Sequence, residues 1–180
     1  MSGFTQSAIL KTFGDMLDRT SFEKVTVSAL IRECGISRNT FYYHYSDIYA
    51  LLDDWISHAL QEYNGADRDV NWQEQVKALL HTCCENKRRV YHVYNSLSRD
   101  RLEQHVFGRA DDSIWNYIQK KVAGRNIPEE RLRAFSDIFR YSLYGFFLRF
   151  LWSGMTEDID ASVDQLGSLF EEILARTLLE

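Results

Sequence analysis

The sequence predicts an all-α protein of about nine helices, and two observations carry that prediction. The chain of 180 residues contains a single proline, Pro128, and nine glycines, so the turn signals that separate strands and hairpins are sparse. Apolar residues recur instead at intervals of three and four along most of the chain. With 45% hydrophobic and 26% charged residues, the composition is that of an ordinary globular protein with a sizeable core.

The first helix is predicted over residues 5–18. Its apolar face is formed by residues at helical spacing: Ile9, Leu10, Phe13, Met16 and Leu17. Phe22 and Val25 follow in a loop and are expected to pack beneath the next helix.

Residues 26–45 predict two short helices joined by a tight turn. The Thr26 hydroxyl can cap the first helix, and Gly35 can adopt the left-handed conformation that ends it. Ser37 can cap the second helix, which runs from Arg38 to Tyr45. A helix, a glycine turn and a second helix that begins with polar residues form the helix-turn-helix pattern, whose second helix enters the major groove of DNA.

The second of these helices concentrates hydrogen-bonding groups, whereas a helical hairpin that only packs against a core would carry aliphatic side chains there. Arg38 suits guanine O6 and N7, and Asn39 suits adenine N6 and N7, so both are predicted to contact bases. The predicted phosphate contacts are Thr26, Ser37, Thr40, Tyr42, Tyr43 and His44. Phe41 and Tyr45 are expected to face the core.

The remaining helices fall on either side of a polar glycine break, Asn-Gly-Ala-Asp, at residues 64–67. Ser46 or Asp47 can cap a helix before the break, whose apolar stripe runs from Ile48 to Leu60. We therefore predict a DNA-binding domain over residues 1–63 and a second domain over residues 64–180. Helices of the second domain are predicted over residues 72–86, 88–98, 101–123, 129–154 and 160–179.

The last two of these helices carry apolar residues on more faces than one chain can cover. Two such helices predict a homodimer in which two copies pack as a four-helix bundle. The residues predicted to form the dimer interface are Phe147, Leu151, Leu166, Phe170 and Ile173.

A specific family resemblance rests on the motif Thr-Val-x-x-Leu-Ile-x-x-Cys-Gly-Ile-Ser-x-x-Thr-Phe-Tyr-x-His-Tyr, which begins at Thr26. Together with the leucine-rich helix that follows, it resembles the N-terminal module of the TetR family of bacterial transcription regulators, over residues 5–60. The run from Phe41 to Trp55 further resembles the branch that includes regulators of dihydroxyacetone kinase operons. Many family members carry a phosphate-binding lysine at the position of Ile48, so its absence implies a shifted pattern of contacts.

The resemblance implies a function as well as a fold. It implies a homodimeric repressor that binds double-stranded DNA at a palindromic operator and is released by a small-molecule effector or a partner protein. In the family the middle helices hold the effector pocket, although a plain aromatic core explains the same side chains. The pocket candidates are Tyr91, Tyr94, Trp115, Phe139 and Phe146. The alternative hypothesis is a protein–protein adaptor that uses this fold with weak or partner-dependent DNA binding.

Metal and enzyme chemistry are not predicted. His81 shares a helical face with Cys84 and Glu85, but the sequence offers no second pair of metal ligands to complete a site with them. We therefore predict no metal and no cofactor. The sequence has no phosphate-binding glycine loop, nucleophile elbow or paired catalytic acids, so we predict that the protein is not an enzyme.

Charge and cysteine content bear on partners and compartment. The net charge is −5, but residues 1–50 hold equal numbers of basic and acidic side chains, so we expect modest non-specific DNA binding with a shallow salt dependence. No secretory leader is visible, and the most apolar run, residues 141–152, is too short to span a bilayer. Three cysteines give no disulfide framework. We therefore expect a cytoplasmic protein without a membrane partner.

Overall fold

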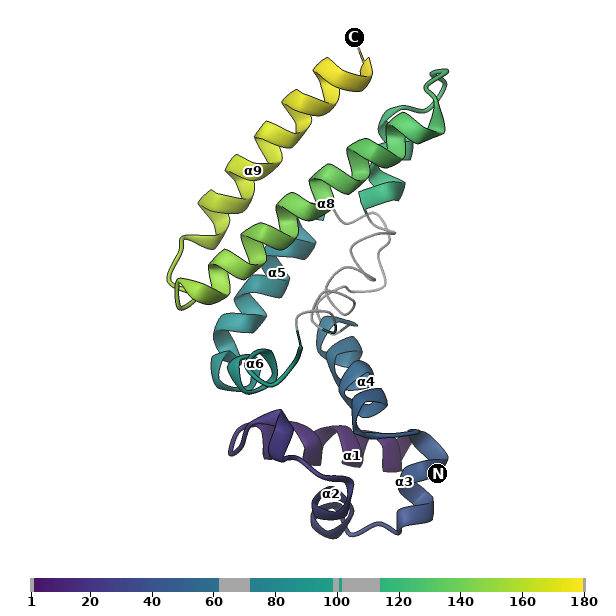
Figure 1. Ribbon diagram of the computed structural model, residues 1–180, viewed down its shortest axis with the longest axis vertical. Helices are drawn as coiled ribbons and strands as arrows, with labels where there is room; N and C mark the ends of the chain where they lie inside the picture. Colours follow the sequence, from purple (N-terminus) through teal and green to yellow (C-terminus); the bar gives the residue numbers. More distant parts are fainter. Residues whose placement is uncertain (1, 62–71, 99–100, 102–113, 180) are drawn as a thin grey trace. The chain divides into compact units, whose positions relative to one another are not determined.

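The computed structural model describes residues 2–61, 72–98, 101 and 114–179, which form helices and turns with no strand among them (Figure 1). The all-α prediction is confirmed. The chain divides into two compact units, residues 1–66 with 85–102 and residues 67–84 with 103–180. The predicted break at residues 64–67 and residues 102–113 of a predicted helix lie outside the described residues. No helix in the described ranges is both long and apolar enough to cross a membrane.

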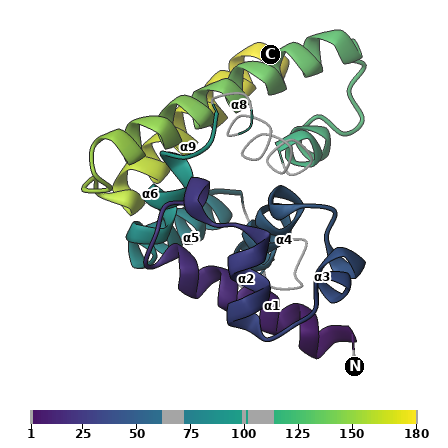
Figure 2. The same cartoon turned by 60° about the horizontal axis from the view of Figure 1, so that its bottom comes forward.

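The N-terminal unit has one apolar core, to which each of its α-helices contributes. These helices are α1 (Ser2–Leu17), α2 (Val27–Cys34), α3 (Arg38–His44), α4 (Ile48–Gln61) and α6 (Lys87–Tyr94). The ring of Phe13 on α1 meets Phe22 and Trp55 edge-on, with centroids 6.2 and 6.0 Å apart. Ile9, Phe13 and Leu17 are fully buried, which confirms the predicted apolar face of the first helix. Figure 2 shows α2 packed on α1.

Local capping sets the ends of the short helices, as predicted. Thr26 Oγ1 accepts a hydrogen bond from Ala29 N at 3.2 Å, and Gly35 ends α2 with φ of 71°. Ser37 Oγ accepts from Thr40 N at 3.0 Å, which begins α3. Only residues 35–37 separate the two helices, so α3 is held at a fixed angle against α2.

α6 packs against the last turns of α1. Arg89 donates to both carboxylate oxygens of Asp18, from Nε at 2.6 Å and from Nη2 at 2.5 Å. His92 Nδ1 lies 2.7 Å from the carbonyl oxygen of Leu17, at hydrogen-bond distance. Both basic side chains therefore lie at the C-terminal end of α1, where the helix dipole favours cations. α6 belongs to the same compact unit as the helix-turn-helix, while a functional division at residues 63 and 64 stays a prediction.

The C-terminal unit is built around an aromatic core. Its described elements are α5 (Trp72–Glu85), a helical stretch over residues 114–121, α8 (Glu129–Trp152) and α9 (Ile159–Leu174), with a π-helical turn at Ala175–Leu179. The Phe139 and Phe170 rings stack with centroids 3.5 Å apart, and Trp72 meets Phe139 edge-on at 5.0 Å. Gly167 allows α9 to approach α5 closely, because a Cβ there would overlap the Gln73 side chain.

A tight turn connects α8 to α9, and Figure 1 shows these two long helices side by side. Gly154 and Met155 both have positive φ angles, 80° and 57°, which reverse the chain direction. Asp158 Oδ1 then accepts a hydrogen bond from Ala161 N at 3.0 Å and caps α9. The two long helices predicted near the end of the chain are confirmed.

Candidate nucleic-acid interface

α3 presents a polar face to solvent and buries its aromatic anchors. Phe41 and Tyr45 are 0% and 5% exposed, which confirms the prediction that they face the core. The exposed members of the helix are Arg38, Asn39, Tyr42 and Tyr43. Because the anchors lie on the opposite face, these four side chains can reach a ligand without unpacking the helix.

The other predicted DNA contacts lie beside this face. Thr26 and Ser37, the N-caps of α2 and α3, are exposed, while Thr40 and His44 are half-buried. Each cap uses an acceptor lone pair of its hydroxyl oxygen. The hydroxyl proton of Thr26 can therefore still donate to a phosphate oxygen.

Arg38 is held by a neighbour that the sequence did not single out. Its Nη2 donates a hydrogen bond to Ser28 Oγ, in the first turn of α2, at 2.9 Å. Ser28 is exposed and follows no apolar periodicity, so no sequence signal marks it. The contact arises only because the turn brings the start of α3 beside the start of α2.

The C-terminal end of α3 is anchored through one carboxylate. Tyr45 Oη donates to Asp54 Oδ2 of α4 at 2.6 Å, and Gln6 Nε2 of α1 donates to the same oxygen at 2.8 Å. Burial, together with the hydrogen bond to Asp54, raises the pKa of Tyr45 above its ordinary value, so the phenol remains a donor. Asp54 thereby ties the end of α3 to both α1 and α4.

Ion pairs neutralise some arginines of the N-terminal unit but not Arg38, which is predicted to contact a base. Arg19 pairs with Glu33, and Arg89 pairs with Asp18. In the part of the chain that the structure describes, Arg38 forms no ion pair and bonds only to a neutral hydroxyl. Its full positive charge is available to DNA.

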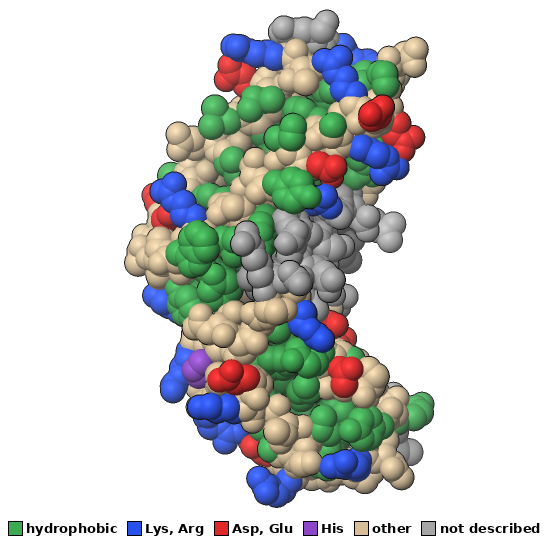
Figure 3. Space-filling view, in the orientation of Figure 1, with side chains coloured by type: hydrophobic (Ala, Val, Ile, Leu, Met, Phe, Trp, Pro, Cys, Tyr) green, Lys and Arg blue, Asp and Glu red, His purple; other side chains and the backbone are tan. Residues whose placement is uncertain are grey.

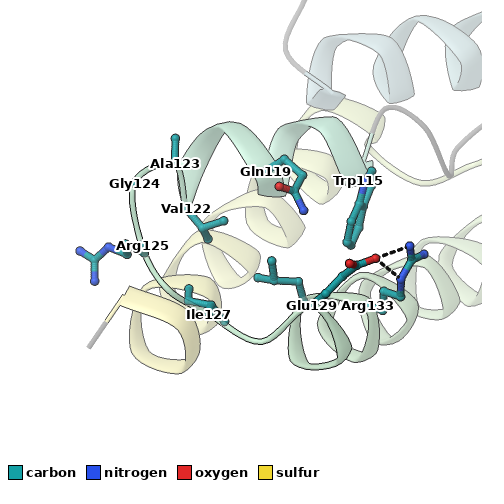
Figure 4. A pocket seen from close by; sticks show the side chains of 10 residues that line it. Trp115, Gln119, Val122, Ala123, Gly124, Arg125, Ile127, Glu129 and Arg133 are labelled. Carbon is teal, nitrogen blue, oxygen red and sulfur yellow. Dashed lines mark hydrogen bonds and ion pairs between the residues drawn. The ribbon is translucent and has the colours of Figure 1, made fainter.

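The structure places the five effector-pocket candidates in different surroundings. Trp115 lines a hollow of about 560 Å³ between residues 114–121 and the start of α8 (Figure 4). Phe139 is buried in the aromatic core, and Phe146 is half-buried on α8. Tyr91 and Tyr94 lie on α6, within the N-terminal unit.

The wall of this hollow combines an aromatic ring with paired charges. The Arg133 guanidinium lies over the Trp115 ring, 5.0 Å from its centroid. Arg133 Nε also donates to Glu129 Oε1 at 2.9 Å, as the dashed lines of Figure 4 show. Gln119 adds an exposed amide to the same wall.

The dimer-interface candidates differ in exposure within one chain. Leu151 and Phe170 are buried in the chain's own core, Phe147 and Leu166 are half-buried, and Ile173 is 54% exposed. Four further apolar side chains on α8 and α9 are exposed but are not among the predicted interface residues: Ile138, Tyr141, Trp152 and Leu169. In Figure 3, hydrophobic side chains spread over the visible face of these helices. Helical spacing in the sequence marks them as members of apolar stripes, but it does not show that a single chain leaves them exposed.

The side chains weighed as metal ligands are engaged elsewhere. His81 Nε2 lies 3.4 Å from Asp160 Oδ1, and Cys84 Sγ lies 3.8 Å from the carbonyl oxygen of Met155. No group of three His, Cys, Asp or Glu side chains within the described ranges could hold a metal ion. Burial raises the pKa of the neighbouring Cys83 thiol to about 12, as expected of an unreactive core cysteine.

A capped helix-turn-helix with an exposed polar second helix, followed by a larger helical unit, defines the class of helix-turn-helix transcriptional regulators. Family models make the assignment specific. Residues 9–54 match the model described as bacterial regulatory proteins, tetR family, and residues 70–172 match TetR_C_8, described as a transcriptional regulator C-terminal region. The chain belongs to the TetR family, which confirms the resemblance drawn from the motif.

Two solved structures share this fold over nearly the whole chain. The dihydroxyacetone kinase operon activator DhaS matches with a TM-score of 0.69 at 18% identity, covering 97% of this chain and 98% of that one. A TetR transcriptional regulator from Streptococcus agalactiae 2603V matches with a TM-score of 0.61 at 20% identity, covering 96% of this chain and 94% of that one. No curated protein sequence matches significantly.

Proposed function

We propose that this TetR-family regulator binds double-stranded DNA at a palindromic operator as a homodimer and acts as a repressor. The observation that carries the proposal is the division of α3 into an exposed polar face and a buried aromatic face. Arg38 and Asn39, at its N-terminal end, have the donors and acceptors that read guanine and adenine edges. The neighbouring hydroxyls and rings suit phosphate oxygens, which fix the register of a protein on the duplex.

The apolar surface of α8 and α9 supports the homodimer. On α8 the partly or fully exposed apolar residues Ile138, Tyr141, Leu148 and Trp152 recur at intervals of three, seven and four. Gly145 lies on the same stripe, where an added Cβ would meet nothing within 4 Å, so a second helix can approach closely. Two copies would bury these stripes as a four-helix bundle, and their two-fold axis would relate two copies of α3. The two copies of α3 would enter major grooves one helical turn, about 34–36 Å, apart, and the two-fold symmetry of the protein would be matched by a palindromic operator.

We further propose that an effector, a small molecule or a partner protein, releases the protein from DNA by binding the C-terminal unit. The hollow beside Trp115 supports a small-molecule site there. A coupling free energy of about 1–3 kcal/mol would weaken operator binding about 5- to 150-fold. Dihydroxyacetone is the first compound to test, because the dihydroxyacetone kinase operon activator DhaS has the same fold. Unchanged operator affinity at saturating dihydroxyacetone excludes that compound.

The test of DNA binding is a titration of the full-length protein against its own upstream DNA, with random DNA as competitor and the salt varied. We expect one palindromic site to saturate about 10³-fold or more tightly than competitor. Arg38→Ala with Asn39→Ala should lose that preference while the protein stays a folded dimer. Lys120→Ala, which removes an exposed cation from the C-terminal unit, is the control and should bind normally.

Two further results decide between the remaining hypotheses. Wild-type binding no tighter than competitor at any salt would contradict the proposal and favour the adaptor hypothesis, with partners then sought by pull-down on the C-terminal unit. If the site is found, a reporter with the operator overlapping its promoter should show lower expression when the protein is present. Higher expression would make the protein an activator.

A further inference from the structure

We propose that Ser28 is a positioning residue for operator recognition, which acts by holding Arg38 in the orientation that reads a base; this rests on the proposed DNA-binding function. The observation is the hydrogen bond from Arg38 Nη2 to Ser28 Oγ at 2.9 Å. Ser28 belongs to α2, and Arg38 is the first residue of α3. The bond therefore joins the two helices of the motif across their turn.

The number of donors on the guanidinium makes this role chemically possible. Arginine carries five N–H groups in a planar fork, and the bond to Ser28 uses one of them. Guanine recognition needs two parallel N–H groups directed at O6 and N7. When one Nη2 proton is engaged, a complete two-donor edge remains. Arg38 can thus keep its bond to Ser28 and read a guanine at the same time.

The chemistry of the partner also favours positioning over neutralisation. Two other arginines of this unit pair with carboxylates, Arg19 with Glu33 and Arg89 with Asp18. If Arg38 were bonded to a carboxylate instead of to Ser28, that carboxylate would compete with DNA for the Arg38 guanidinium. The Ser28 hydroxyl restricts the long side chain without cancelling its charge. Arg38 and Ser28 are both exposed, so core packing does not fix the guanidinium, and the hydrogen bond to Ser28 restricts its orientation.

The size of the effect follows from the cost of ordering a flexible side chain on binding. Without Ser28, Arg38 must be ordered at the moment of binding, which corresponds to about a 2- to 12-fold loss of affinity per half-site. A dimer that reads two half-sites should lose about 5- to 150-fold on its operator. Random DNA, where Arg38 makes no defined base contact, should be bound as before.

A double-mutant cycle on the full-length protein tests the inference. Operator and random-DNA affinities are measured for wild type, Ser28→Ala, Arg38→Ala and the double variant. Thermal unfolding of each checks that it is folded. Ser28→Ala should weaken operator binding alone and add no further loss in the Arg38→Ala background, because Ser28 acts through Arg38. Ser28→Thr, which keeps the hydroxyl, should restore most of the affinity. Ser57→Ala, which removes a hydroxyl that donates to the Asp53 carbonyl oxygen on α4, is the control.

The outcomes separate this inference from the proposed function. Additive losses from the two substitutions would overturn it, since Ser28 would then contact DNA independently. Unchanged or tighter operator binding by Ser28→Ala would also overturn it, because the bond would then be neutral or would hold Arg38 away from DNA. A wild-type protein that does not prefer its operator would instead remove the DNA-binding function, and the inference with it.

Discussion

Ile173→Ala should weaken the proposed homodimer without unfolding the chain. Ile173 lies on α9, and 54% of its surface is exposed in one chain. It follows Leu169, which is 50% exposed, by one helical turn. Because more than half of the side chain is exposed, its truncation should cost a single chain only part of the stability that a fully buried isoleucine would cost, and the chain should stay folded.

The expected magnitude follows from the surface that is still exposed. Complete burial of an isoleucine side chain is worth about 1.5–3 kcal/mol, and roughly half of that remains to be gained at Ile173. Because each subunit of a two-fold dimer carries the substitution, the free energy of association should fall by about 1.5–3 kcal/mol. The dimer dissociation constant should therefore rise about 10- to 150-fold.

Sedimentation equilibrium over a range of protein concentrations measures this constant directly. Phe4→Ala is the matched control, because Phe4 is 87% exposed but lies on α1. We expect Phe4→Ala to dimerise like the wild type. An Ile173→Ala protein with an unchanged dissociation constant would refute the assignment of this face of α9 to the dimer, and so would a wild type that is monomeric at all concentrations.

Three further predictions concern the N-terminal unit. Ser37→Ala removes the cap of α3 and should lower the unfolding free energy by about 1 kcal/mol in urea denaturation, with weaker operator binding; equal stability would mean that the cap is dispensable. Tyr45→Phe removes a buried donor to Asp54 and should cost about 1.5 kcal/mol by the same assay, whereas no loss would mean that the bond adds nothing. The hydrogen bonds from Arg89 lower the pKa of Asp18 below its ordinary value of 3.8, so their stabilisation is present above that pH and is lost as the pH falls below it. Acid denaturation should show Asp18→Asn losing stability at neutral pH and converging with wild type in acid; parallel curves would contradict this linkage.

The helix-turn-helix could be predicted from the sequence because its determinants are local. The Thr26 and Ser37 caps act within three residues, and Gly35 sets its own backbone angle. The alternation that buries Phe41 and exposes Tyr42 is likewise contained in one short helix. Interactions of this range depend on neighbours along the chain, so spacing alone predicted them.

The side-chain hydrogen bonds between helices that hold the helix-turn-helix in place could not be predicted from the sequence. Ser28 bonds to Arg38, and Gln6 and Tyr45 share Asp54, across sequence separations of ten, 48 and nine residues. Polar surface residues have no periodicity that identifies their partners. Only the packing angle between helices, which the assembled core determines, decides which hydroxyl faces which guanidinium.

The dimer surface shows a second limit of periodicity. Leu151 and Ile173 both belong to apolar stripes of long helices, yet Leu151 is 1% exposed and Ile173 is 54% exposed within one chain. A stripe shows that a helix has an apolar face, but it does not show whether the chain itself or a second copy covers that face. The distinction depends on how α8 and α9 pack: the stacked rings of Phe139 and Phe170 are buried between them, while Ile138 and Leu169, the residues that precede these rings, are exposed. We therefore expect dimerisation to depend on the apolar residues that the folded chain leaves exposed, and not on every apolar residue of these helices. These exposed residues are Ile138, Trp152, Leu169 and Ile173.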